Sequence, residues 1–325
     1  MKICAMMFRL MVVGMLVIFS GAAAAQQSYP TKPIRFIIPF APGGSNDALA
    51  RIFGPKLTES WGQQVIVDFR AGGNTVIGTE ALVKSSPDGY SLLLMNMAHV
   101  ITPLLIATPY DAVKDFAAVA TISKSECLLV LHPSVPANTF QEFVALAKAR
   151  PGQLNYATSG SGGSTHLATE LLSMMTGIRM QHIPYKGAGP AMIDLLGGQV
   201  QLAINVPINY IQHVNSGKLK AVAITGESRL SSLPQLPTFA EAGLPGFDVK
   251  IWFGFLAPAA TPREIVDKLS TEFARILMLP DIKASLASQG MDPLISTPTQ
   301  FAALMRTDLA RFANVVKTAN IKLSN

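Results

Sequence analysis

Three turns rich in glycine and small polar residues are the features of this sequence best suited to chemistry. They are FAPGGSND at 40–47, TSGSGGSTH at 158–166 and YKGAGP at 185–190, and each joins a strand-like apolar run to residues at helical spacing. The first N–H groups of a helix lack intrahelical partners and lie at the positive end of the helix dipole. Glycine lets a ligand approach this backbone closely. The turns therefore predict sites for a phosphate or a carboxylate.

A purely structural role for the same residues stays open at this point. Ser45, Ser164 and Thr165 could be helix N-caps, and Gly43 with Gly44 could serve only a tight turn. No turn has the P-loop pattern and none completes the G-x-G-x-x-G pattern, so the turns do not predict a nucleotide site.

Charged residues near the turns have simple interpretations. Asp47 would favour the dipole of its helix, and its charge makes it a ligand contact only for a hydrogen-bond donor such as an amine or hydroxyl. Lys186 and Arg70 are expected to be solvated loop residues. The predicted anion sites thus depend on backbone groups and hydroxyls.

Motifs for catalysis or metal binding are missing from the sequence. It holds no G-x-S-x-G, H-E-x-x-H or C-x-x-C pattern, and its five histidines do not have metal-ligand spacing. We therefore expect no metal and no cofactor. An exported α/β hydrolase acting on a carboxylate ester or amide is the alternative, with Ser164 or Ser161 as nucleophile and His166 as base. No third, orienting group is evident for it.

Composition favours a globular protein of about two domains. The chain has 325 residues, of which 49% are hydrophobic and 14% charged, with a mean hydropathy of +0.35. The formal charge of +6 is a weak bias without basic clusters that alternate with aromatics, so no nucleic-acid partner is expected. Cys4 falls in the leader described next, which leaves Cys127 as an expected buried hydrophobe that cannot form an intramolecular disulfide.

The first residues have the pattern of a secretory signal peptide. Lys2 and Arg9 precede an apolar run at 10–19, followed by small residues and two glutamines. The run is too short to span a bilayer as a helix. We expect export and cleavage after Ala25.

Strand-like and helix-like segments alternate along the rest of the chain. Nearly continuous apolar strands imply an α/β fold with parallel or mixed sheets flanked by helices. Expected strands lie at 34–40, 65–67, 91–95, 127–131, 154–158, 179–184, 200–204, 219–225 and 251–256. Expected helices include 140–149, 164–175 and 190–196, and two amphipathic helices follow residue 260.

This alternation divides into two α/β lobes. The first lobe is expected to hold residues 26–124 together with 251–325, and the second lobe residues 125–250. The proline- and glycine-containing stretch 227–248 is expected to be a surface excursion of the second lobe.

At these turns the chain resembles the extracytoplasmic solute receptors of the tripartite tricarboxylate transporters, the Bug family. The resemblance runs from about Tyr29 to Leu323. It rests on 29–30, 38–47, 86–90, 115–116, 151–156, 161–167, 184–187, 194–200, 236–238 and 241–246.

The resemblance implies a type II, Venus-flytrap periplasmic binding protein that is monomeric and closes on its ligand. The ligand would be a small mono-, di- or tricarboxylate or an aromatic acid, passed on to a membrane permease. A ligand-loaded sensor for a signalling partner would share this site and is not distinguished. The implied ligand-binding residues are Gly43, Gly44, Ser45 and Asp47 on one lobe, and Ser159, Ser161, Gly163, Ser164 and Thr165 on the other.

Two departures from the family pattern lie near the expected cleft. After Arg70 the family often shows Pro-Gly-Ala-Gly-Gly-Asn, whereas this chain has AGGNTV at 71–76. Near Asn205 the family often has an acidic residue, which could pair with the ammonium of an amino acid. We therefore expect Thr75 and Asn205 to be specificity positions, and a ligand other than an amino acid is favoured.

Overall fold

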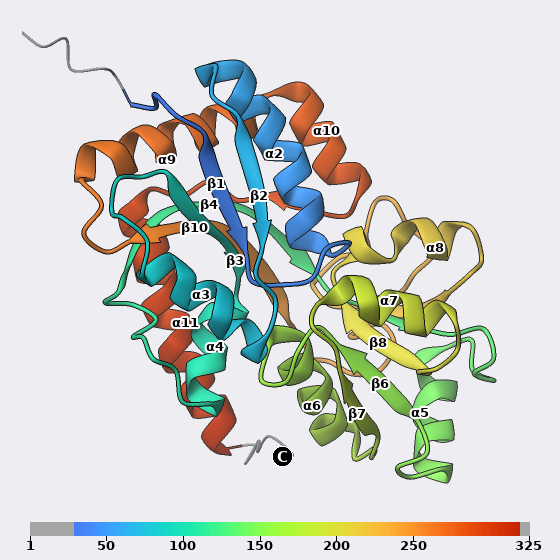
Figure 1. The fold of residues 1–325 in the computed structure, drawn as a ribbon. Coiled ribbons are helices and arrows are strands. Elements are labelled where there is room, and N and C mark those ends of the chain that lie inside the picture. Colours follow the sequence, from blue (N-terminus) through green and yellow to red (C-terminus); the bar gives the residue numbers. More distant parts are fainter. Residues whose placement is uncertain (1–28, 319–325) are drawn as a thin grey trace, which may run out of the picture.

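Two β-sheets, each flanked by helices, organise the protein. The computed structural model describes residues 29–318 (Figure 1). We call the part built on the six-stranded sheet the first lobe and the part built on the five-stranded sheet the second lobe. The predicted signal peptide lies outside the described residues. Within residues 29–318, no helix is both long and apolar enough to cross a membrane.

The sheet of the first lobe is mixed. Its order is β11-β4-β10-β3-β1-β2, in which β1 pairs parallel with β2 and β3 whereas β10 runs antiparallel to β3 and β4. The strands are β1 (Ile34–Ile38), β2 (Val65–Phe69), β3 (Ser91–Asn96), β4 (Phe116–Glu126), β10 (Lys250–Pro258) and β11 (Asp292–Pro293). The central strand β3 is buried along its whole length because helices cover both faces of the sheet, as its continuous apolar run predicts.

Aromatic side chains fix the helices to the two faces of this sheet. Phe273 stacks on Phe255 at 4.3 Å between ring centroids and packs edge-on against Phe53, which places α9 and α2 on one face. Phe301 packs against Trp252, which places α11 on the other. The helices are α2 (Ser45–Trp61), α3 (Val76–Val83), α4 (Ala98–Leu105), α9 (Arg263–Met278), α10 (Pro280–Ser288) and α11 (Pro298–Thr318). The two predicted amphipathic helices are confirmed as α9 and α11.

The sheet of the second lobe has the order β7-β6-β8-β5-β9. Strand β6 pairs parallel with β7 and β8, whereas β5 pairs antiparallel with β8 and β9. The strands are β5 (Leu128–Leu131), β6 (Asn155–Thr158), β7 (Gln181–Pro184), β8 (Leu202–Asn205) and β9 (Lys220–Ile224). The helices are α5 (Phe140–Ala149), α6 (Ser164–Thr176), α7 (Ala188–Leu196) and α8 (Ile211–Asn215). The predicted helix 140–149 is confirmed with the same bounds.

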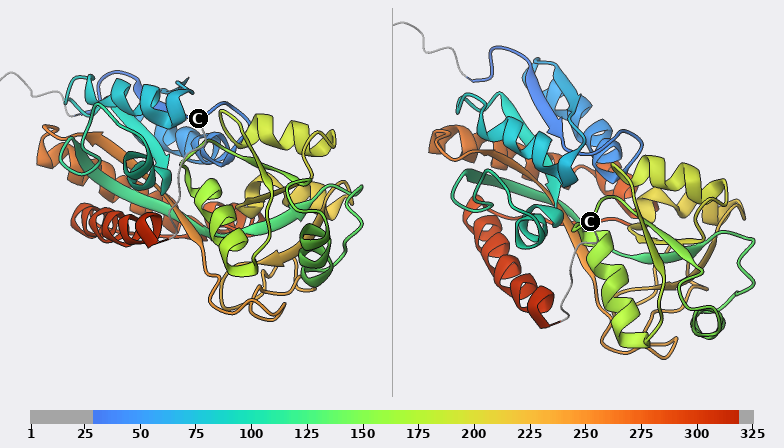
Figure 2. Two further views of the ribbon diagram at one scale, coloured as in Figure 1. Left: turned by 90° about the horizontal axis from the view of Figure 1, so that it is seen from below. Right: turned by 60° about the horizontal axis from the view of Figure 1, so that its bottom comes forward.

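Two crossing segments connect the lobes, and hydrogen bonds join them at the crossing (Figure 2). One segment leads from β4 through Cys127 into β5, and the other leads from β9 to β10. The N–H of Cys127 donates to Thr225 Oγ1 over 2.8 Å, and that hydroxyl donates to the carbonyl of Val249 over 2.7 Å. Cys127 is fully buried, as expected, and burial raises the pKa of its thiol. The crossing therefore forms a narrow hinge about which the lobes can turn.

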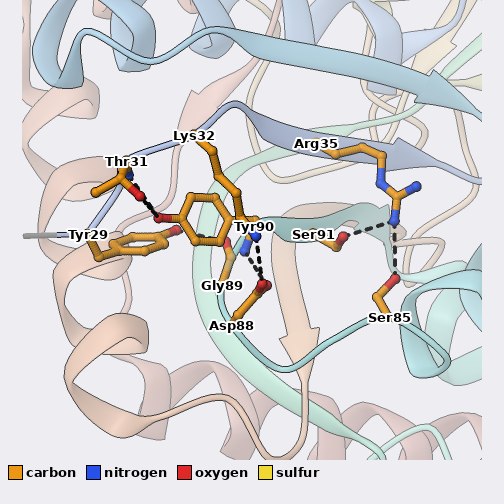
Figure 3. Close-up of polar contacts among 9 residues, drawn as sticks. All are labelled: Tyr29, Thr31, Lys32, Arg35, Ser85, Asp88, Gly89, Tyr90 and Ser91. Carbon is orange, nitrogen blue, oxygen red and sulfur yellow. Dashed lines mark hydrogen bonds and ion pairs between the residues drawn. The ribbon is translucent and has the colours of Figure 1, made fainter. Parts of the chain in front are cut away.

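The start of the described chain is attached to the turn before β3 (Figure 3). Tyr29 donates through its hydroxyl to the carbonyl of Gly89, and the N–H of Thr31 donates to the hydroxyl of Tyr90. Lys32 forms an ion pair with Asp88 at 3.1 Å. These contacts hold the start of β1 beside β3, which helps to fix where the first glycine-rich turn leaves β1.

Candidate functional site

The first glycine-rich turn leads into a helix whose first turn has no side-chain cap. Helix α2 begins at Ser45, and its N-cap residue is Gly44, so Ser45 is not an N-cap. The carboxylate of Asp47 accepts from the N–H of Gly43 over 2.9 Å and pairs with Arg51 at 2.7 Å. Asp47 thus holds the turn in place. The first N–H groups of α2 have no hydrogen-bond acceptor within the helix.

The second glycine-rich turn has the same design in the second lobe. Helix α6 begins at Ser164 after the N-cap residue Gly163, again without a side-chain cap. The hydroxyl of Thr165 accepts from the N–H of Ser159 over 3.1 Å, so Thr165 joins the two ends of the turn. The N-cap interpretation of Ser45, Ser164 and Thr165 is therefore wrong, because glycines occupy both cap positions. The positive ends of α2 and α6 belong to different lobes.

Both helix starts line one buried cavity between the lobes. Its walls are formed by Phe40, Ala41, Gly44, Ser45, Asn46, Asp47, Asn96, Ser159, Ser164, Thr165, Ala188, Asn205, Ile251 and Phe253. No lysine or arginine belongs to this wall within the part of the chain that the structure describes. The cavity volume is about 10 Å³, close to the room of one water molecule. A carboxylate group is larger than one water molecule, so side chains of the wall must shift when one binds.

A second, larger cavity lies beside the first. It has a volume of about 240 Å³ and shares Phe40 and Ser159 with the first cavity. The other wall residues are Pro39, Gly72, Gly73, Asn74, Thr75, Ser161, Pro184, Tyr185 and Lys186. Lys186 is its one charged wall residue in the described chain, so the second cavity lacks an acidic group that would repel an anion.

The predicted site residues divide between the two cavities. Gly44, Ser45, Asp47, Ser159, Ser164, Thr165 and Asn205 line the first, and Thr75, Ser159 and Ser161 line the second. Gly43 and Gly163 lie in the turns just before the helices and outside both walls. The ligand contacts of all these residues remain predictions.

Two buried asparagines of the first cavity escaped the sequence analysis. Asn46 donates through its side-chain nitrogen to the carbonyl of Leu94 over 2.8 Å, which ties α2 to β3. Asn96 ends β3, and its oxygen accepts from the N–H of Ala98. Polar residues at the carboxyl end of a buried strand are the signal that could have found Asn96.

The third glycine-rich turn forms a contact between the lobes. The N–H of Ala41 donates to the carbonyl of Lys186 over 2.7 Å. A Cβ atom on Gly189 would lie 2.1 Å from the carbonyl oxygen of Pro42, and one on Gly44 would lie 3.3 Å from the Ala188 side chain. The lobes therefore meet backbone to backbone here, which only glycine at position 189 permits.

Behind the second turn lies a stack of aromatic rings. His166 and His182 are parallel with 4.0 Å between ring centroids, and the ring centroid of Tyr156 lies 5.0 Å from His182 and 6.3 Å from His166. His166 accepts from the N–H of Gly162 through Nδ1 over 3.1 Å. Burial lowers the pKa of His166 to about 4, and burial together with His166 lowers that of His182 to about 4. These neutral rings support the shape of the turn.

This arrangement gives no support to the hydrolase alternative. The Nδ1 atom of His166 is occupied by Gly162, and Nε2 lies 3.9 Å from the carboxylate of Glu170. Among the hydrogen bonds of the described residues, none joins His166 to Ser161 or Ser164. Within the same residues, no group of three or more His, Cys, Asp or Glu side chains is placed to hold a metal ion.

Two mixed sheets, a two-segment hinge and a site between the lobes define a periplasmic binding protein. The model of the tripartite tricarboxylate transporter family receptor matches residues 49–321. The chain therefore belongs to this family of solute-binding receptors, for which the periplasm is the expected location.

Three relatives illustrate the family. Protein BugT of Bordetella pertussis is 37% identical over 319 residues, covering 97% of this chain and 98% of BugT. The structure of R. palustris Rpa4515 with adipate is 33% identical with a TM-score of 0.88, covering 90% of this chain and 99% of that one. MatC from Rhodopseudomonas palustris with bound malate is 29% identical with a TM-score of 0.84, covering 89% and 100%.

Proposed function

We propose that this protein captures a small carboxylate between its two lobes and delivers it to membrane permease subunits of a tripartite tricarboxylate transporter. It acts as a monomer without catalysis, after export and cleavage behind Ala25. We further propose the lobe boundaries at 26–124 with 251–325 and at 125–250; strand β4 runs two residues past the first boundary, to Glu126. The carboxylates named with Rpa4515 and MatC support the ligand class.

The observation that carries this proposal is the pair of uncapped helix starts, α2 and α6, on one buried cavity. Their main-chain N–H groups have no intrahelical partner and the helix dipoles favour negative charge there. Hydrogen bonds to a charged acceptor contribute about 1.5–3 kcal/mol each. Two or more from each lobe would hold a carboxylate without a cationic side chain and would draw the lobes together.

Thermal unfolding of the mature protein with matched acids and amides tests this function. Succinate, glutarate, adipate, malate and benzoate are each compared with the corresponding amide, which has nearly the same shape without the charge. A ligand present at 100 times its Kd should stabilise the protein by about 2.7 kcal/mol. We expect at least one acid to do so and the matched amide to have no effect.

The contrary result is equally clear. Equal stabilisation by an acid and its amide, or by none of the acids, would contradict carboxylate capture. Hydrolysis of an added carboxylate ester that stops in the Ser164→Ala and His166→Gln variants would replace the proposal by the hydrolase.

A further inference from the structure

Thr75 combines three properties that ordinary loop residues lack. Its φ of 79° is left-handed, a region that a β-branched side chain rarely adopts. It is only 6% exposed, and its hydroxyl oxygen is buried without a hydrogen-bond partner. It also lines the second cavity. Backbone strain and a buried unpaired hydroxyl both lower the stability of the protein. We therefore ask whether the hydroxyl of Thr75 gains a hydrogen-bond partner when a ligand binds.

The surrounding contacts fix the backbone of Thr75 against the cavity. The short helical turn Gly73–Thr75 leads directly into α3, and Gly78 lets α3 approach β1 so closely that a Cβ there would lie 2.7 Å from Pro39. Asn74 accepts through Oδ1 from the N–H of Ser161 in the second lobe over 3.1 Å. Thr75 is therefore held at the second cavity when the lobes are closed.

The residues around the second cavity favour a ligand group that accepts hydrogen bonds. Its wall includes Thr75, Ser161 and the cation Lys186, and no carboxylate belongs to the wall in the described chain. The hydroxyl of Tyr185 is already used, because it donates to Asp194 over 2.6 Å. Since this cavity adjoins the first at Phe40 and Ser159, one elongated ligand can occupy both.

We propose that Thr75 determines the specificity of this receptor: its hydroxyl donates to an acceptor group at the far end of a ligand whose first carboxylate lies between α2 and α6. The inference rests on the proposed function and narrows its ligand class to elongated acids with a polar second end. A ligand with an alkyl end would leave the hydroxyl of Thr75 without a partner, and the receptor would bind it more weakly.

Calorimetric titration with pairs of acids that differ only in the far group tests the inference. The pairs are succinate with butyrate, glutarate with pentanoate and adipate with hexanoate. The variant Thr75→Val keeps the shape but removes the hydroxyl, Thr75→Gly also accepts the left-handed backbone without strain, and Thr75→Ser restores the hydroxyl. Thr79→Val is the control, because Thr79 is a fully buried threonine of α3 that lines neither cavity.

We expect the wild-type protein to bind at least one diacid more tightly than its partner monoacid. Thr75→Val and Thr75→Gly should each lose about tenfold in diacid affinity or more, as expected for one hydrogen bond to a charged acceptor. Monoacid affinity should not change, Thr75→Ser should keep the preference, and Thr79→Val should behave as the wild type.

The failures of the two proposals are distinguishable. If the wild-type protein binds neither member of any pair and no acid of the thermal-unfolding series, the proposed function fails and this inference with it. If it binds malate or benzoate but neither member of any pair, the carboxylate receptor stands and this inference fails. If it binds acids but Thr75→Val changes diacid and monoacid affinity equally, or neither, the carboxylate receptor stands and Thr75 does not determine its specificity. Loss of the preference in Thr75→Ser would also overturn the assignment.

Discussion

Replacing Gly189 with alanine should weaken carboxylate binding by about a hundredfold or more. The new Cβ atom would lie 2.1 Å from the carbonyl oxygen of Pro42 in the opposite lobe, so the lobes could not close as they do here. A ligand held by one lobe alone loses the hydrogen bonds of the other. Two such bonds to a carboxylate are worth about 3 kcal/mol or more, which is the stated loss.

The fold should tolerate this change, since Gly189 belongs to the helix α7, where alanine is favourable. Gly197→Ala at the end of the same helix is the matched control, because its Cβ would meet no atom closer than 3.4 Å. Titration calorimetry measures affinity and small-angle X-ray scattering measures closure. Wild-type affinity together with normal compaction in Gly189→Ala would show that the contact between residues 42 and 189 does not form in the bound state.

Acidification from pH 7 to about pH 4 should remove several kcal/mol from the free energy of unfolding. Burial lowers the pKa of His99 and of His166 from 6.5 to about 4, and the two side chains are 1% and 5% exposed. Below pH 6.5 the unfolded chain binds protons that the folded chain does not, so stability falls as the pH falls. Each group contributes about 1.4 kcal/mol per pH unit over the window from 6.5 to 4, which is roughly 3 kcal/mol per group.

Chemical denaturation at half-unit pH steps measures this dependence. His166→Gln removes one titrating ring but can still accept from Gly162 through its amide oxygen, so the slope of stability against pH should decrease by about one proton. Charged and titratable neighbours of His166 are His182, Tyr156 and Glu170. Removal of His166 also removes one cause of the lowered pKa of His182, whose burial remains. His213→Gln, at a half-buried position in α8, is the control. An unchanged slope in His166→Gln would show that His166 titrates normally in the folded protein.

The sequence was sufficient for elements with strong local patterns. The glycine-rich turns at 40–47 and 158–166 predicted both helix starts, because small residues directly before an amphipathic segment are typical of a turn that leads into a helix. Strand β4 was missed because buried Thr121, Ser123 and Ser125 make it look like a polar loop. These hydroxyls donate to the carbonyls of Leu294, Asp292 and Gly290, partners more than 160 residues away that no local pattern shows.

Long-range packing also explains which parts of the site the sequence did not predict. The pattern of 185–190 predicted a third anion-binding turn, but the turn instead meets residues 41–44 of the opposite lobe across a close backbone contact. Likewise, β10 inserts between β3 and β4 in the antiparallel sense, which brings Phe253 into the first cavity from far along the chain. Spacing along the sequence could not show either contact. The first depends on how the lobes come together, and the second on the strand order within the first lobe.

A crystal structure of the mature protein with the carboxylate that stabilises it most would test the central claim most directly. We expect a carboxylate oxygen within about 3 Å of main-chain nitrogens in the first turns of both α2 and α6. A carboxylate bound instead by Lys186 or Arg70, with those main-chain nitrogens covered by the protein's own side chains, would contradict the account.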